Sequence, residues 1–100
     1  LARGGYRLFQ EGLALIQQVR RTSPHTEVLV VTGFDDGDSL LRAIRAGAGG
    51  CISKADQLNG AEIRAGIVEV AAGRRFSSPL VYQRIHSLLQ QGTGGAPLFA

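Results

Sequence analysis

A short apolar run near the middle of the chain predicts a β-strand. Val28, Leu29, Val30 and Val31 follow one another directly, and Thr32-Gly33 ends the run. Unbroken runs of mostly β-branched residues are typical of parallel strands that are buried on both faces, whereas half-buried strands alternate apolar and polar residues. We therefore predict a parallel strand that needs cover on both of its faces.

The residues after this strand complete a βαβ unit. Apolar residues recur at helical spacing from Ser39 to Gly47, and a second short strand is predicted for Gly50 to Lys54. Open α/β sheets bind ligands outside the carboxyl ends of their strands. Thr32 and Lys54 end the two strands, so we expect a hydroxyl and an ammonium to converge there on one anionic group.

Three further segments show the helical period. The predicted helices begin at Glu11, after Asn59 and at Pro79, and they end at Ser23-Pro24, Gly73 and Gly92. In the third of the four helices, the apolar residues that recur on one side are Ile63, Ile67, Val68 and Val70. The first ten residues, Leu1 to Gln10, show neither the strand period nor the helix period and are predicted to form a loop.

Three aspartates precede the helix of the βαβ unit. Asp35, Asp36 and Asp38 stand where a carboxylate can accept hydrogen bonds from free amide groups and interact favourably with the helix dipole. We interpret them as capping residues rather than as a metal site. Gly47 is the predicted C-terminal cap of the same helix.

Two parallel strands do not make a stable sheet, because their outer backbone groups stay unpaired. We therefore interpret the sequence as part of a domain. The remaining strands would precede Leu1, be absent from the sequence, or come from another chain by swapping.

Composition excludes several classes of protein. The chain has 100 residues, of which 44% are hydrophobic and 19% charged, as expected for one small globular domain. Its formal net charge of +3 comes from arginines spread over several segments, which does not indicate a nucleic-acid surface. A single cysteine rules out an internal disulfide and fits a reducing cytosol. No signal-peptide or membrane-spanning run is present, so a cytoplasmic location is predicted. His25 and His86 lack partners at metal-ligand spacing.

Several segments together resemble a known family. They are Glu11-Gly12-Leu13 at the opening of a helix, Val28 to Thr32 as a strand, Arg45 to Gly50 before the next strand, and Ala71 to Pro79 at the end of the domain. Their order, with the spacing from Thr32 to Lys54, resembles the C-terminal half of response-regulator receiver domains of the LuxR/NarL type, over about residues 11–91. The resemblance implies an α/β fold, a flavodoxin-like (CheY-like) doubly wound parallel sheet, of which only the last strands and helices lie here.

The resemblance also implies a site that senses a phosphoryl group. In this family an aspartate at the end of the third strand carries the group, and acidic residues near the first strand hold Mg²⁺. Thr32 matches the position whose hydroxyl contacts the phosphoryl oxygen, and Lys54 matches the position whose ammonium pairs with it. Gly33 matches a small residue that leaves room for the group.

Cys51 stands at the switch position of the family, where many receivers have an aromatic residue that reorients on activation. A small thiol cannot report rotation as a ring does. We interpret Cys51 as a small buried hydrophobe, with a redox sensor as the alternative.

A signalling role rather than an enzyme follows from the resemblance. The chain would be the receiver module of a two-component transcription regulator of the LuxR family, a phosphoprotein in a phosphorelay. It would be served by a histidine kinase, act as a homodimer, and reach DNA only through a C-terminal helix-turn-helix domain outside these residues. Residues 1–91 would form a partial receiver domain, and residues 92–100 a Gly-rich linker.

The chain departs from the family pattern in one important respect. No aspartate occurs in residues 1–34, so the phosphoacceptor and the Mg²⁺ ligands are not in this chain, and the spacing from Gly12 would put the acceptor near Gly4. Three interpretations stay open: a receiver whose acceptor lies upstream, a pseudo-receiver that acts as a phosphorylation-independent dimerisation or interaction domain, and a fragment of an unrelated doubly wound enzyme. The last would use Thr32 and Lys54 at an anion site, but no dinucleotide fingerprint or P-loop is present.

Overall fold

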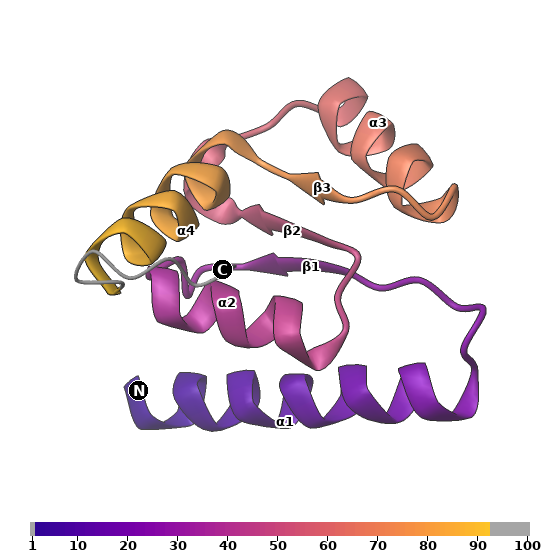
Figure 1. Cartoon of the computed structure of the whole chain (residues 1–100), viewed down its shortest axis with the longest axis horizontal. Coiled ribbons are helices and arrows are strands. Elements are labelled where there is room, and N and C mark those ends of the chain that lie inside the picture. The colour runs from indigo at the N-terminus through magenta and orange to yellow at the C-terminus, as the bar shows by residue number, and fades with distance from the viewer. Residues whose placement is uncertain (1, 93–100) are drawn as a thin grey trace.

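The computed structural model describes the backbone of residues 2–92 and the side chains of residues 7–91. The predicted linker, residues 92–100, lies outside this range except for Gly92. In chain order the elements are α1 (Ala2–Thr22), β1 (Leu29–Thr32), α2 (Gly37–Ala46), β2 (Gly50–Ser53), the 3₁₀ turn η1 (Lys54–Asp56), α3 (Gly60–Ala71), β3 (Phe76–Ser77) and α4 (Pro79–Gly92) (Figure 1).

The three described strands form one parallel sheet in the order β1-β2-β3. Leu29 is paired with Gly50 and Thr32 with Ser53, so β1 and β2 end at the same edge of the sheet. Helix α2 contacts both α1 and α4, whereas α3 lies apart from them beside β3 (Figure 1). The βαβ unit predicted from the sequence is confirmed.

Local end signals place α2 where the sequence predicts it. The Asp36 carboxylate accepts a hydrogen bond from the Ser39 backbone N–H at 3.0 Å, which makes Asp36 the N-cap. Gly47 ends the helix with φ 119°, in the left-handed region where a glycine has no Cβ to strain. Both predicted caps are therefore confirmed.

The strand that is buried on both faces is β2, not β1. All four residues of β2 are buried, because β2 lies between two strands and under helices on its faces. In β1 the Val31 side chain is 52% exposed. The prediction for β1 was wrong. An apolar run indicates that both faces of a strand are suited to burial, but within the described residues no element packs over the β1 face that carries Val31.

A third strand, β3, was not predicted. It has only two residues, too few for a periodic signal, and it forms because the chain returns alongside β2. Phe76 N–H donates to the Gly49 carbonyl at 3.2 Å, and Ser78 N–H donates to the Cys51 carbonyl at 3.1 Å. Tertiary pairing rather than local preference therefore makes this strand.

The loop predicted for Leu1 to Gln10 is also wrong, since α1 runs from Ala2 to Thr22. Phe9 continues the helical spacing of Leu13 and Ile16 by one turn, and all three side chains face the same pocket beside β1. Packing of this apolar stripe extends the helix beyond the segment that shows a clear period. The predicted end of the helix at Ser23-Pro24 is confirmed.

The apolar side predicted for α3 is largely exposed. Val70 is buried, but Ile67 and Val68 are 50% and 60% exposed. The helix lies close to the sheet at Gly66, where an added Cβ would meet the Phe76 ring at 2.8 Å, and at Val70, whose Cγ2 would lie 2.7 Å from a Cβ at Gly50. Contacts at these two residues therefore hold α3 against β3 and β2.

The fully buried core lies between β2, α2 and α4. Its cluster consists of Cys51, Leu40 and Val81, one residue from each of these elements, with Val30 and Ile85 packed against it. Because Val81 is 0% exposed, α4 is an integral part of the packed unit.

Close packing at Gly50 makes a direct test of the sheet arrangement. A Cβ at Gly50 would lie 2.7 Å from Leu29 Cδ1, 2.7 Å from Val70 Cγ2 and 3.0 Å from the Phe76 carbonyl oxygen. We expect Gly50→Ala to lower the free energy of unfolding by about 1–3 kcal/mol through overpacking, measured by urea denaturation.

Gly60→Ala is the matched control, since no atom lies within 4 Å of a Cβ at this position in α3. It should leave stability unchanged or raise it by less than about 1 kcal/mol. Equal stabilities for the two variants would contradict the described packing of β2.

Candidate functional site

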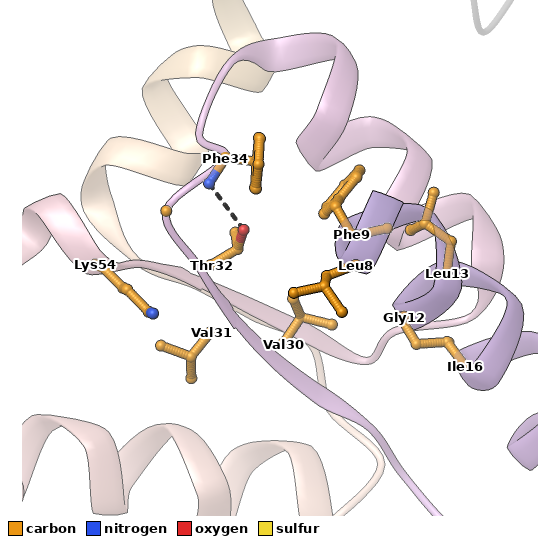
Figure 2. A pocket seen from close by; sticks show the side chains of 12 residues that line it. Leu8, Phe9, Gly12, Leu13, Ile16, Val30, Val31, Thr32, Phe34 and Lys54 are labelled. Carbon is orange, nitrogen blue, oxygen red and sulfur yellow. Dashed lines mark hydrogen bonds between the residues drawn. The ribbon is translucent and has the colours of Figure 1, made fainter. Parts of the chain in front are cut away.

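The predicted site residues Thr32, Gly33 and Lys54 line one pocket of about 410 Å³. The pocket lies between α1 and the end of β1 (Figure 2). Its other lining residues are mostly apolar: Leu8, Phe9, Gly12, Leu13, Ile16, Val30, Val31, Phe34 and Ala43. The two strand ends thus bring a hydroxyl, a glycine and an ammonium to the same apolar-walled space.

Thr32 is buried, at 7% exposure, and its hydroxyl is held by a local turn. The hydroxyl oxygen accepts a hydrogen bond from the Phe34 backbone N–H at 2.9 Å, drawn in Figure 2. A hydroxyl that accepts one bond can still donate its own proton. Thr32 is therefore positioned as a hydrogen-bond donor to an acceptor in the pocket.

Gly33 follows Thr32 on an open part of the loop. It is exposed, and an added Cβ would meet no atom within 4 Å. Packing among the described residues does not require glycine here. The expectation that this position leaves room for a phosphoryl group stays a prediction.

Lys54 is exposed and begins η1 directly after β2. The Ser53 hydroxyl caps this turn by accepting a bond from Ala55 N–H at 3.1 Å. Figure 2 shows the Lys54 side chain on the pocket that Val31 also lines. Within residues 7–91 it forms no ion pair, so its ammonium is available to an anion.

The arrangement can bind an anion but does not form a metal centre. An ammonium and an oriented hydroxyl supply positive charge and a donated hydrogen bond. Among the described residues, no group of three or more His, Cys, Asp or Glu side chains is placed to hold a metal ion. The residues present therefore do not fit the Mg²⁺ that the resemblance implies.

The three aspartates after the pocket have structural partners. Asp35 accepts from the Ser53 hydroxyl at 3.1 Å, and Asp38 pairs with Arg42 at 3.1 Å across one helical turn. Asp36 accepts from both the Ser39 hydroxyl, at 2.7 Å, and its backbone N–H. These contacts confirm the capping interpretation for Asp36.

The hydrogen bonds from Ser39 lower the pKa of the Asp36 carboxyl group. Partial burial acts to raise the pKa of its carboxyl group, but the hydrogen bonds from the Ser39 side chain and backbone outweigh burial. The pKa of Asp36 is therefore below its ordinary value of 3.8.

Cys51 lies in the core and not in the pocket. It is 0% exposed on the central strand β2, in contact with the core cluster of Leu40 and Val81. Burial raises the pKa of its thiol to about 11. These surroundings favour the small buried hydrophobe over the redox sensor, because reactive thiols are exposed and have lowered pKa values.

Sequence reasoning missed the aromatic contact at the side of the pocket. The Phe9 and Phe34 rings lie with centroids 5.3 Å apart, joining α1 to the loop after Thr32. The spacing of Phe9 to Leu13 and Ile16 was the available signal. It was missed because the first ten residues were interpreted as a loop.

The two histidines take no part in this pocket. His86 stacks on Tyr82 along α4, with ring centroids 6.1 Å apart, and His25 lines a separate hollow beside Leu29 and Ile67.

Among the described helices, none has the length and apolar character required to cross a bilayer.

Comparison with known proteins supports a relationship to response regulators. Over 45 residues the chain is 40% identical to the transcriptional regulatory protein ComA of Bacillus subtilis (strain 168), a match that covers 45% of this chain and 21% of ComA. The structure is similar to that of a two-component response regulator of the LuxR family from Aurantimonas sp. SI85-9A1. The TM-score is 0.67, with 26% identity over 86% of this chain and 71% of the other. No family model matches the chain.

These similarities confirm the predicted fold class. Residues 2–92 form an α/β unit with three parallel strands in the CheY-like arrangement of the solved response regulator. Its match spans about a fifth of the length of ComA.

The lowered pKa of Asp36 predicts a pH dependence of stability. A carboxylate with a folded pKa below its unfolded value stabilises the fold above about pH 3.8 and loses that contribution as pH falls through the folded pKa. Asp36→Asn keeps a good N-cap without the charge. In urea denaturation, the stability advantage of wild type over this variant should shrink from about pH 6 to about pH 2.5. A constant difference over this range would argue against the charged cap.

The burial of Cys51 predicts slow thiol chemistry. With a pKa of about 11, only about one thiol in a thousand is ionised at pH 8, even before access is considered. A thiol with the ordinary pKa of 9.0 is about one-tenth ionised at pH 8, so reaction with a disulfide reagent such as DTNB should be at least about a hundredfold slower in the folded protein than in urea. Rapid labelling without urea would restore the redox-sensor interpretation.

Proposed function

We propose that this chain is the receiver module of a two-component transcription regulator, related to the response regulators that it resembles. It senses phosphorylation of an aspartate that is not among these residues and controls dimerisation or DNA binding of an attached domain. The observation that carries the proposal is the common pocket of Thr32, Gly33 and Lys54 at the carboxyl edge of the sheet.

Each of these residues has a distinct role in recognition. The Lys54 ammonium is free to pair with a phosphoryl oxygen, and the Thr32 hydroxyl can donate to a second oxygen while the Phe34 amide holds it in place. The open space at Gly33 admits the group. The proposed role of the three residues is sensing rather than catalysis.

The binding step acts on the loop from Gly33 to Asp38. Thr32 and Phe34 belong to one local turn, so movement of the hydroxyl toward an anion also moves the loop that leads into α2. Two discrete positions of this loop would give two arrangements of the helices behind it. Such a change provides a route from phosphorylation to a dimer surface.

The expected partners follow from this role. A histidine kinase supplies the phosphoryl group, a second copy of the protein forms the homodimer, and DNA contacts the attached domain rather than this one. Mg²⁺ would be held by acidic residues outside this chain, together with the phosphoacceptor. The proposed setting is the cytoplasm.

The second candidate is a pseudo-receiver that dimerises without phosphorylation. It would apply if no aspartate after a third strand precedes these residues, since residues 1–34 contain none. In that case the pocket would keep its lining without receiving an anion. Thr32 and Lys54 would then be ordinary residues at strand ends.

Beryllofluoride, which mimics a phosphoryl group, separates the two candidates. Added with Mg²⁺ to the full-length protein, it should shift the monomer–dimer equilibrium in analytical ultracentrifugation. Lys54→Ala and Thr32→Ala should each weaken this response about tenfold or more, as expected for loss of a charge-assisted or oriented hydrogen bond.

Arg64→Ala, which changes an exposed residue of α3 outside the pocket, serves as the control and should respond like wild type. A dimer that forms equally with and without beryllofluoride would overturn the receiver proposal in favour of the pseudo-receiver.

A further inference from the structure

Ser53 lies at a junction of buried and partly buried hydrogen bonds. Its hydroxyl donates to the Asp35 carboxylate at 3.1 Å and accepts from Ala55 N–H at 3.1 Å. Its backbone N–H donates to the Ser78 hydroxyl at 3.1 Å. Ser53 and Ser78 are 1% and 0% exposed. Three segments that are distant in sequence therefore meet at one residue.

Two of these segments adjoin the pocket residues Thr32 and Lys54, and the third leads into α4. Asp35 belongs to the loop after Thr32, Ala55 lies in the turn that begins with Lys54, and Ser78 directly precedes α4. Because water is excluded at Ser53 and Ser78, breaking these bonds would leave buried polar atoms without partners. Movement of one segment alone would therefore cost free energy, whereas movement of the three segments together keeps the hydrogen bonds.

A second link ties the Lys54 turn to α4. Both carboxylate oxygens of Asp56 accept from the Leu80 backbone N–H at 3.1 Å, within the first turn of α4. Ser53 and Asp56 stand on either side of Lys54 in the sequence. The residue that would pair with an anion is thus anchored to α4 from both directions.

Helix α4 also packs directly behind the loop. A Cβ at Gly37, the first residue of α2, would lie 3.0 Å from the Arg84 carbonyl oxygen and 3.0 Å from Leu88 Cβ. Val81 fills the core against Leu40. The start of α2 is therefore packed so closely against α4 that movement of the loop would push on α4.

From these contacts we infer that Ser53 is a positioning residue that couples the loop after Thr32 to helix α4, so that α4 is the element that responds when the pocket is occupied. The occupant, a phosphoryl group, rests on the proposed function. The coupling itself rests on the hydrogen bonds and the packing of α4, not on the occupant. It gives the protein a route through β2 that does not depend on an aromatic ring at Cys51.

The coupling is testable without any ligand. Asp35→Ala removes the loop end of the network, and amide hydrogen exchange at Leu80 and Tyr82 reports on the first turn of α4. We expect Asp35→Ala to lower protection at these amides about threefold or more in the wild-type background. The effect should disappear in the Ser53→Ala background, because the connection is already broken.

Two further variants sharpen this experiment. Ser78→Ala breaks the same network at its other end and should also abolish the effect of Asp35→Ala, which provides a second background if Ser53→Ala does not fold. Ser77→Ala changes the neighbouring exposed serine and should leave the effect intact. An equal effect of Asp35→Ala in every background, or no effect in any, would overturn the coupling.

Beryllofluoride with Mg²⁺ on the full-length protein tests the response to an occupant. Chemical shifts of the Thr32 to Phe34 amides report binding, and those of Leu80 and Tyr82 report α4. Both sets should change in wild type, whereas Ser53→Ala should keep the first change and lose the second. Unchanged α4 shifts in wild type despite binding would refute the inference. If the Thr32 to Phe34 amides do not respond, the proposed function fails, and the hydrogen-exchange experiment alone decides the coupling.

Discussion

Burial of the central strand β2 is the constraint on which the rest of the structure depends. All four of its residues are buried. Position 50 requires glycine, because a Cβ there would be too close to Leu29, Val70 and the Phe76 backbone. A strand in this position has two parallel neighbours, so its end and that of β1 meet at one edge. The pocket, the turn that carries Lys54 and the start of α4 are all positioned by that edge.

The side chains at this edge supply a positive charge and an oriented hydroxyl. The proposed recognition of a phosphoryl group uses an exposed ammonium, a buried hydroxyl oriented by a backbone amide, and open space beside a glycine. The acidic residues nearby are engaged in structure, since Asp36 caps α2 and Asp35 binds Ser53. These two carboxylates therefore hold the loop and the start of α2 in place.

Features fixed by neighbouring residues could be predicted from the sequence, and features fixed by tertiary packing could not. Asp36 and Gly47 act within one helical turn of α2, so its bounds were correct to within about two residues. The start of α1, the exposure of Val31 and strand β3 depend on surfaces that meet only after folding. In the site, the order of the strands was enough to bring Thr32 and Lys54 together. Ser53 gave no signal, because an ordinary serine acquires its role from partners that lie 18 and 25 positions away.

The inaccessible thiol of Cys51 has a practical consequence for following the motions of this protein. It is the single cysteine of the chain and is fully enclosed by β2, α2 and α4. Under native conditions, a cysteine introduced on the surface of α4 would be the one thiol of this chain that is accessible to a maleimide or a nitroxide reagent. Fluorescence or electron-paramagnetic probes can therefore be attached site by site while the native core is kept intact, without first replacing the residue at its centre.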